Sequence, residues 1–241
     1  MAVEEAGQRA LDLSKALSTG EGRPLSASDA TRDSSEGVDY DQAAEEYGWR
    51  GPEVAFGLAY AFIEPGQTLL DIGIGTGLGS VLFHKAGLRI YGMDLSPEML
   101  TACRKKAFAA DLQQHDLTVE PYPYADTSVD HAICVGVLQF IPDVACVYRE
   151  VSRILRDDGT FTFIVADRMP GEDAELAVGT EHTESGETRI LYRLSGGEVG
   201  DLLGENGFAP LRNVMFSVPM DRERKRLLRV CGYVARRVRR V

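Results

Sequence analysis

The stretch Leu69-Leu70-Asp71-Ile72-Gly73-Ile74-Gly75-Thr76-Gly77-Leu78-Gly79 decides how the rest of the chain is interpreted. The apolar run from Thr68 to Ile72 is long enough for a buried strand, and it gives way to glycines at alternate positions. Helical spacing resumes at Ser80. Glycine lets backbone N–H groups approach a ligand closely, and the first turn of a helix favours anionic groups. Strand, glycine turn and helix together predict a nucleotide-binding turn.

The composition indicates an α/β domain of ordinary size. A chain of 241 residues with 44% hydrophobic content can bury a sizeable core. No apolar run approaches the ~20 residues of a membrane span, and the first residues lack the apolar region of a signal peptide. The net charge of −11 disfavours nucleic acid as a partner. Four scattered cysteines without metal-type spacing predict free thiols, no metal site and a cytoplasmic location.

The charge is unevenly distributed along the chain. Residues 221–241 carry nine Lys or Arg against two acids, which is +7 locally and leaves −18 for residues 1–220. Such a tail could bind RNA or an anionic membrane. Its apolar residues fall where a last strand is expected, however, so we interpret the arginines as solvated.

The chain divides into a lead-in segment and one domain. Residues 1–38 contain no aromatic residue and are rich in Ser, Ala, Gly, Asp and Glu, which predicts a flexible N-terminal segment. Residues 39–241 alternate strand and helix patterns, which predicts a parallel sheet covered on both faces. Strands are expected at 68–72, 88–93, 112–115, 129–137, 160–166, 208–218 and 227–235, and helices at 41–47, 52–62, 80–86, 97–107, 143–155 and 198–205. The acidic segment 168–188 follows the fifth strand, where it forms either a substrate lid or a plain surface loop.

Asp94 closes the second predicted strand. The spacing from Gly73 to Asp94 is that of a βαβ unit whose second-strand acid binds a ribose diol. Ser96 and Pro97 are a good N-cap and a good first helical residue, so Asp94 alone could merely help to cap that helix. The glycines upstream favour the ribose role.

The glycine spacing also excludes common ligands. A dinucleotide-binding turn carries GxGxxG, but the sixth position counted from Gly73 is Leu78 and from Gly75 it is Ser80. The lysine of a nucleoside-triphosphate-binding loop is absent as well. The pattern Asp-x-Gly-x-Gly-x-Gly suits a ligand without pyrophosphate, which also argues against a nicotinamide oxidoreductase.

Five motifs in order resemble one known family. The segments LDIGIGTG, YGMDLSPEML, HDL, VDHAICVGVLQFI and DDGTFTFIV look like those of the class I S-adenosylmethionine-dependent methyltransferases. The resemblance covers about Tyr40 to Arg237. The segments WRGPE and CGYVARR are similar to the small methyltransferase-like proteins of the Williams–Beuren region group. The family implies a Rossmann-like, doubly wound sheet of seven strands, mostly parallel, with one antiparallel strand near the C-terminus.

The resemblance implies S-adenosylmethionine as cofactor, S-adenosylhomocysteine as its product, and roles for particular residues. Asp71 would lie near the ligand's ammonium group, Asp94 would accept both ribose hydroxyls, and Asp116 would accept from the adenine amino group, with Asp111 as a competing candidate. The other implied cofactor residues are Gly73, Ile74, Gly75, Gly77, Leu95, Met99, Leu117, Val135, Gly136 and Leu138. Tyr47 and Trp49, ahead of the nucleotide-binding strand, either close over the ligand or anchor the core.

The acceptor of the methyl group is less defined. The sequence after the fourth strand lacks the Asn-Pro-Pro-Tyr type of motif expected in enzymes that methylate nucleic-acid bases. A small molecule is therefore the expected acceptor; a protein side chain, or a non-catalytic S-adenosylmethionine sensor, are the alternatives. No general base is obvious, and the candidates are Tyr40, Tyr47, His182 and Asp143. Methyl transfer from a sulfonium is an in-line displacement that positioning alone can accelerate.

Overall fold

The strand that carries Asp71 lies in the middle of a mostly parallel sheet. The computed structural model of the chain describes residues 37–179, 188–221 and 223–238. In it β1 (Thr68–Ile72) pairs in parallel with β2 (Arg89–Asp94) on one side and with β4 (Val129–Cys134) on the other. Beyond them lie β3 (Ala109–Gln114), which pairs with β2, and β5 (Leu155–Asp167), which pairs with β4, both in parallel.

Two C-terminal strands complete this sheet. The strand β9 (Leu227–Arg237) pairs antiparallel with β5, and β8 (Phe208–Pro219) pairs antiparallel with β9. The order is therefore β3-β2-β1-β4-β5-β9-β8, with β9 running against the other six strands. This confirms the predicted Rossmann-like, doubly wound arrangement of seven strands with one antiparallel strand near the C-terminus.

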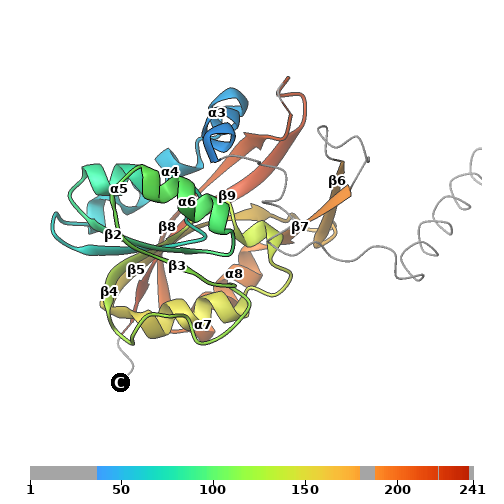
Figure 1. Cartoon of the computed structure of the whole chain (residues 1–241). Coiled ribbons are helices and arrows are strands. Elements are labelled where there is room, and N and C mark those ends of the chain that lie inside the picture. Colours follow the sequence, from blue (N-terminus) through green and yellow to red (C-terminus); the bar gives the residue numbers. More distant parts are fainter. Residues whose placement is uncertain (1–36, 180–187, 222, 239–241) are drawn as a thin grey trace, which may run out of the picture.

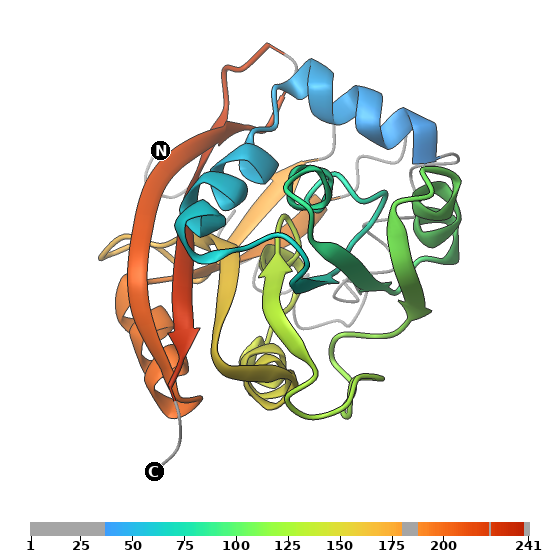
Figure 2. The ribbon, with the colours of Figure 1, turned by 90° about the vertical axis from the view of Figure 1, so that its left-hand side faces the viewer.

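Helices cover both faces of the sheet (Figures 1 and 2). One face carries α4 (Gly51–Ala59), the short 3-10 helix η1 (Tyr60–Phe62), α5 (Val81–Lys85) and α6 (Pro97–Lys105). The other face carries α7 (Ala145–Ile154) and α8 (Gly196–Glu205). Because side chains alternate along a strand, Leu69 packs on the α5–α6 side and Leu70 on the α7–α8 side, each in its own core cluster. No helix in the described part of the chain combines the length and the apolar character needed to cross a membrane.

A β-hairpin that the sequence analysis missed extends the sheet at the end of β5. It consists of β6 (Glu175–Gly179) and β7 (Thr188–Leu194), which pair antiparallel. β7 in turn pairs in parallel with the last two residues of β5, Ala166 and Asp167. Within the described part of segment 168–188, residues 175–179 and 188 belong to this hairpin, and residues 168–174 form neither helix nor strand. That this segment acts as a lid stays a prediction.

Several element boundaries also differ from the prediction; β4, for example, ends at Cys134, whereas the predicted strand extends to residue 137. Residues 156–159, which separate the predicted helix 143–155 from the predicted strand 160–166, lie inside β5; Asp158 there has a φ of 66°, and the register with β4 shifts. At the other end of the chain α3 (Gly37–Tyr47) begins before the predicted Asp41. The flexible segment predicted for residues 1–38 otherwise lies outside the described residues.

Candidate functional site

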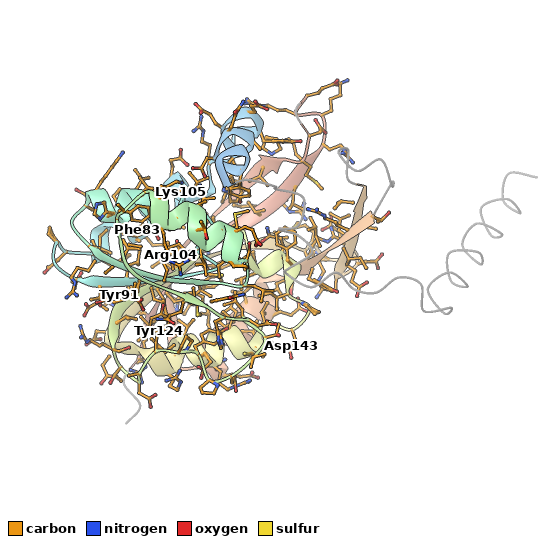
Figure 3. All side chains as sticks on the ribbon, viewed as in Figure 1. Phe83, Tyr91, Arg104, Lys105, Tyr124 and Asp143 are labelled. Atoms are coloured by element: carbon orange, nitrogen blue, oxygen red, sulfur yellow. The ribbon has the colours of Figure 1, made fainter. Side chains whose placement is uncertain are left out.

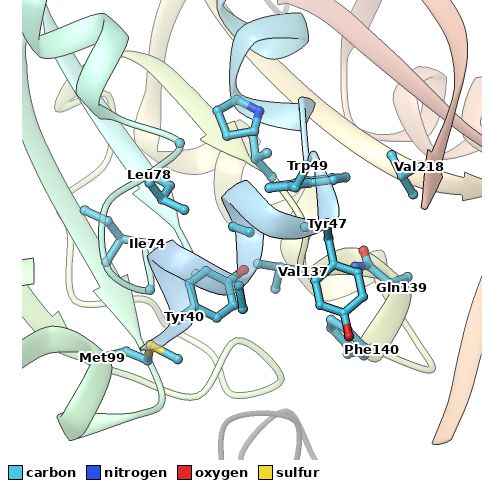
Figure 4. Close-up of a pocket in the computed structure, with 18 of the residues that line it drawn as sticks. Tyr40, Tyr47, Trp49, Ile74, Leu78, Met99, Val137, Gln139, Phe140 and Val218 are labelled. Carbon is cyan, nitrogen blue, oxygen red and sulfur yellow. The ribbon is translucent and has the colours of Figure 1, made fainter. Parts of the chain in front are cut away.

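The carboxyl ends of the central strands open into a cavity of about 440 Å³ (Figure 4). Its floor comes from the glycine turn after β1, the end of β2 and the segment after β4, and α3 covers it. Residues from the β8–β9 turn close the far side. The lining residues are Tyr40, Ala43, Ala44, Tyr47, Trp49, Pro52, Gly73, Ile74, Gly75, Leu78, Gly79, Asp94, Leu95, Met99, Leu117, Val135, Gly136, Val137, Gln139, Phe140, Arg189, Val218, Pro219, Met220 and Leu228.

Backbone hydrogen bonds hold the glycine turn in place. The N–H groups of Gly73 and Ile74 both donate to the carbonyl of Met93, at 2.8 and 3.0 Å. Gly73 has a φ of 73°, and a Cβ there would lie 2.5 Å from a methyl group of Val137. Gly75 has a φ of 54°, but a Cβ there would meet no atom within 4 Å. The turn is therefore packed below Gly73 and open toward the cavity at Gly75, where a ligand can approach the backbone.

Asp94 braces this turn. Its Oδ2 accepts a hydrogen bond from Gly75 N–H at 2.8 Å and its Oδ1 accepts one from Ser96 N–H at 2.9 Å. Only 8% of the residue is exposed, and burial raises the pKa of its carboxyl group although these backbone bonds oppose the shift. Each carboxylate oxygen has a second acceptor site. The side chain is therefore held in a fixed orientation at the cavity surface, with both carboxylate oxygens engaged by backbone N–H groups.

Asp71 lies under the turn instead of in the cavity wall. Its Oδ2 accepts a 2.5 Å hydrogen bond from Ser80 Oγ, and a Cβ on Gly79 would lie 3.2 Å from the same oxygen. Burial raises the pKa of Asp71 to about 7. Gly79 itself lines the cavity, so only its backbone separates the carboxylate of Asp71 from bound ligand.

The structure brings together most of the predicted cofactor residues. Those that line the cavity are Tyr47, Trp49, Gly73, Ile74, Gly75, Asp94, Leu95, Met99, Leu117, Val135 and Gly136. Gly77 does not line it, because it faces Phe108 of the β3 side, 2.5 Å from where its Cβ would be. Leu138 does not either: the 3-10 helix η2 (Leu138–Phe140) turns this side chain into the core, where it is 2% exposed.

The two acids proposed for the adenine amino group differ in position. Asp111 is exposed within β3 and accepts a hydrogen bond from Gln113 at 2.7 Å. Asp116 follows the carboxyl end of β3 and precedes Leu117, a buried cavity residue. Both hydrogen bonds that Asp116 accepts from Thr118 involve Oδ1. Of the two, Asp116 is the acid beside the cavity.

The four general-base candidates are also separated by the structure. Tyr40 and Tyr47 line the cavity, and Figure 4 shows the Tyr40 hydroxyl turned toward its middle. Burial and the nearby Asp94 raise the pKa of Tyr40, so its phenol stays protonated and suits a hydrogen-bond donor better than a base. Asp143 is exposed just before α7 (Figure 3), where it accepts a hydrogen bond from Ala145 N–H at 2.9 Å; it is not among the residues that line the cavity. His182 lies outside the described residues.

Hydrogen bonds attach α3 to the body of the domain. Thr76 Oγ1, within the glycine turn, donates to Asp41 Oδ1 at 2.5 Å, and Lys106 at the end of α6 forms an ion pair with Asp41 Oδ2. The helix carries Tyr40, Ala43, Ala44 and Tyr47 onto the cavity. Asp41 therefore holds α3 over the cavity through its contacts with Thr76 and Lys106.

Sequence reasoning missed the far half of the cavity. Arg189 comes from β7, while Val218, Pro219, Met220 and Leu228 come from the end of β8 and the start of β9. Because β9 is antiparallel, the β8–β9 turn lies at the same sheet edge as the glycine turn. The predicted antiparallel strand was the signal that could have placed these residues. In the described parts of the chain no group of three or more His, Cys, Asp or Glu side chains is arranged to hold a metal ion.

The known proteins with similar sequences are described as methyltransferases. Residues 70–163 match the family described as "Methyltransferase domain". The chain is 28% identical over 125 residues to a ubiquinone biosynthesis O-methyltransferase of Xanthomonas campestris, covering 49% of this chain and 51% of that protein. It is 30% identical over 166 residues to a Mycolicibacterium smegmatis protein named as a probable S-adenosylmethionine-dependent methyltransferase, covering 67% and 63%. These matches leave a third to a half of each relative's length unmatched.

The fold is shared with solved structures as well. The 1,6-didemethyltoxoflavin-N1-methyltransferase of Burkholderia thailandensis, solved with its acceptor and S-adenosylhomocysteine, superposes with a TM-score of 0.63 at 20% identity, over 90% of this chain and 93% of that one. At this identity the likeness concerns the fold. Residues 70–163 therefore match the methyltransferase domain family, and the chain around them has the fold of solved S-adenosylmethionine-dependent methyltransferases.

Proposed function

We propose that this protein transfers the methyl group of S-adenosylmethionine to a small-molecule acceptor. The observation that carries the proposal is the position of Asp94, whose two carboxylate oxygens are fixed at the cavity surface by the backbone N–H groups of Gly75 and Ser96. A ribose diol needs that pair of acceptors. The cavity then continues from Asp94 into an apolar half that a cofactor alone has no reason to require.

The residues at the glycine turn fit the cofactor's other groups. Leu95, Met99 and Leu117 offer apolar surfaces to the adenine ring, and Asp116 offers Oδ2 to its amino group. The ammonium group would lie above Gly79, where the buried Asp71 supplies the opposite charge through the thin glycine backbone. Binding a cation there would favour ionised Asp71 and lower its pKa.

The chain's contribution to the reaction is positioning and exclusion of water. When bound, S-adenosylmethionine supplies a methyl group on a sulfonium; a lone pair of the acceptor forms the new bond to carbon, and the C–S pair stays with sulfur to give S-adenosylhomocysteine. Val137 lies between the two halves of the cavity (Figure 4), and Val135 and Gly136 line the cavity with it; these residues would align the acceptor with the methyl group. The neutral Tyr40 hydroxyl can orient the acceptor by donating a hydrogen bond.

A small molecule is the acceptor class that the site favours. With α3 in place the cavity is covered, and its volume is at the lower end of the ~300–1,000 Å³ of small-molecule sites. The matched relatives with named substrates include a ubiquinone biosynthesis enzyme and the toxoflavin precursor enzyme, whose acceptors are small molecules by name.

Two measurements test the proposal. Calorimetric titration with S-adenosylmethionine, S-adenosylhomocysteine and NAD should give binding of the first two only; silence for both would refute the proposal, and binding of NAD alone would indicate an oxidoreductase. Incubation with a metabolite extract should then convert S-adenosylmethionine to S-adenosylhomocysteine. Turnover with a protein extract only would indicate a protein methyltransferase, and tight binding without any turnover would indicate a sensor.

A further inference from the structure

The cavity has an apolar, aromatic end away from the cofactor residues. Figure 4 shows Gln139, Phe140 and Val218 on the side of the cavity opposite Met99, and we call this side the acceptor end. Trp49 and Phe140 pack against the core cluster that contains Val218, and both rings line the cavity. A wall of this kind favours a flat ligand that can stack on it.

The fold turns Gln139 into the acceptor end. After β4 ends at Cys134 the chain forms the single turn η2, in which Phe140 N–H donates to the Val137 carbonyl at 2.9 Å. A 3-10 helix has three residues per turn, so successive side chains leave it in directions about 120° apart. Leu138 points into the core, and Gln139 and Phe140 therefore point out of it and line the cavity.

The side-chain amide of Gln139 is available to a ligand, because it forms no hydrogen bond with any residue that the structure describes. Two other polar side chains that line the cavity, Tyr47 and Arg189, already interact with other groups of the chain. The indole N–H of Trp49 can donate but cannot accept. Gln139 therefore offers a ligand at this end both a hydrogen-bond donor and a hydrogen-bond acceptor.

The acceptor end favours an uncharged ligand. A buried charge is costly unless an opposite charge pairs with it. Arg189 is already engaged, and the carboxylate of Asp94 is fixed to backbone N–H groups at the cofactor end. A carboxylate or ammonium group of a ligand would thus enter an apolar site in which the described lining residues offer no free opposite charge.

We propose that the methyl acceptor is an uncharged, planar nitrogen heterocycle with a cyclic amide edge, stacked on the aromatic wall and held by two hydrogen bonds to Gln139. This inference rests on the proposed methyl transfer and names the substrate class of the same site. The amide oxygen of Gln139 accepts from the ring N–H, and its NH₂ group donates to the adjacent ring carbonyl. Glutamine pairs with the edge of adenine through the same kind of two-bond contact. Because one edge of the ring is fixed in this way, the pairing also sets which other edge faces the methyl group.

The test uses three two-ring probes of similar size. The full-length protein is first saturated with S-adenosylhomocysteine, and calorimetry then measures 2-quinolone, N-methyl-2-quinolone and 2-naphthoate. The first has the N–H and carbonyl edge, the second has its N–H blocked, and the third carries a negative charge. We expect 2-quinolone to bind about tenfold more tightly than either of the other two.

Two substitutions at Gln139 test its role directly. Gln139→Leu should make 2-quinolone and N-methyl-2-quinolone bind with similar affinity. In Gln139→Glu the carboxylate can accept from N–H groups but cannot donate to a carbonyl, so it should favour 2-aminoquinoline, whose protonated form presents two N–H donors. The affinity for 2-aminoquinoline relative to 2-quinolone should rise at least about tenfold over its wild-type value. A residue that only supports the fold would not exchange one preference for the other.

The controls separate this inference from the proposed function. Gln42→Leu makes the same change at an exposed position of α3, where Gln42 bonds to Glu46 outside the cavity lining, and should leave every preference unchanged. Binding of S-adenosylhomocysteine, measured before any probe is added, should be the same in wild type and both Gln139 variants, which also shows that they fold.

Each outcome has a distinct meaning. If S-adenosylhomocysteine does not bind, the proposed function fails and this inference with it. If it binds but 2-naphthoate is the tightest probe, the acceptor is anionic and this inference alone is overturned. The same holds if 2-quinolone and its N-methyl analogue bind equally, if no probe binds, or if Gln139→Leu keeps the wild-type preference.

Discussion

Replacing Asp94 by asparagine tests the centre of the proposed site. The amide oxygen can still accept one of the two backbone N–H groups, from Gly75 or Ser96, but the amide nitrogen cannot accept the other. A buried N–H left without an acceptor costs about 1–3 kcal/mol of folding stability. For a domain of this size that corresponds to a melting temperature lower by about 2–4 °C per kcal/mol.

The same substitution should weaken cofactor binding for a separate reason. One ribose hydroxyl loses a charged acceptor, which is worth about 1.5–3 kcal/mol, or roughly ten- to 150-fold in affinity. Calorimetric titration with S-adenosylhomocysteine measures this change, and urea unfolding measures the loss of stability in the same preparation. Alanine would be a poorer choice, because it leaves both N–H groups without an acceptor.

Asp111→Asn is the matched control for this experiment. It makes the same chemical change on the neighbouring strand, at an exposed side chain bonded to Gln113. It should alter neither stability nor affinity measurably. Unchanged affinity in Asp94→Asn, or an equal loss in Asp111→Asn, would mean that the ribose is held elsewhere.

Three further predictions follow from buried or paired groups. Burial raises the pKa of Asp71 from 3.8 to about 7, so the free energy of unfolding should fall by on the order of 4 kcal/mol as pH rises between those values. Urea unfolding of Asp71→Asn should lack this fall. Wild type and variant losing stability in parallel over this pH range would contradict the prediction. Burial lowers the pKa of His131 from 6.5 to about 4, so stability should drop by on the order of 3 kcal/mol as pH falls through that window, and His131→Gln should remove the drop. These slopes oppose each other, so each must be measured as the difference between wild type and the single variant. Asp41→Asn should release α3 from Lys106 and raise the dissociation rate of S-adenosylhomocysteine by up to about fivefold with little change in stability, because a partly exposed ion pair is worth roughly 1 kcal/mol or less. An unchanged rate in stopped-flow displacement would show that α3 does not limit release.

Local patterns in the sequence predicted the parts of the structure that depend on local chemistry. The glycine turn, the Ser96 cap of α6 and the acid at the end of β2 all lie where the spacing placed them. The hairpin β6–β7 escaped prediction because it is short and pairs with β5 through only two residues, which no periodicity reveals.

Individual side-chain directions were harder to predict than the elements. Leu138 follows the fourth strand as the family pattern requires, but the turn of η2 points it into the core and exposes Gln139 and Phe140 instead. Asp143 has the right chemistry for a base, yet it lies just before α7, bonded to Ala145 N–H and outside the cavity lining. Both outcomes depend on tertiary geometry that a residue type does not encode.

The cavity joins two halves that are encoded in different parts of the chain. The cofactor end is built within residues 70–163, the span that matches the methyltransferase domain family. Most of the opposite half, where we propose that the acceptor binds, comes from outside that span: from α3 and Trp49 before it, and from β7, β8 and β9 after it. Similarity to relatives over residues 70–163 therefore points to the methyl donor but carries little information about the methyl acceptor. The same division makes the domain modular: exchanging residues 188–228 between homologous proteins should exchange acceptor preference while the cofactor end is inherited intact.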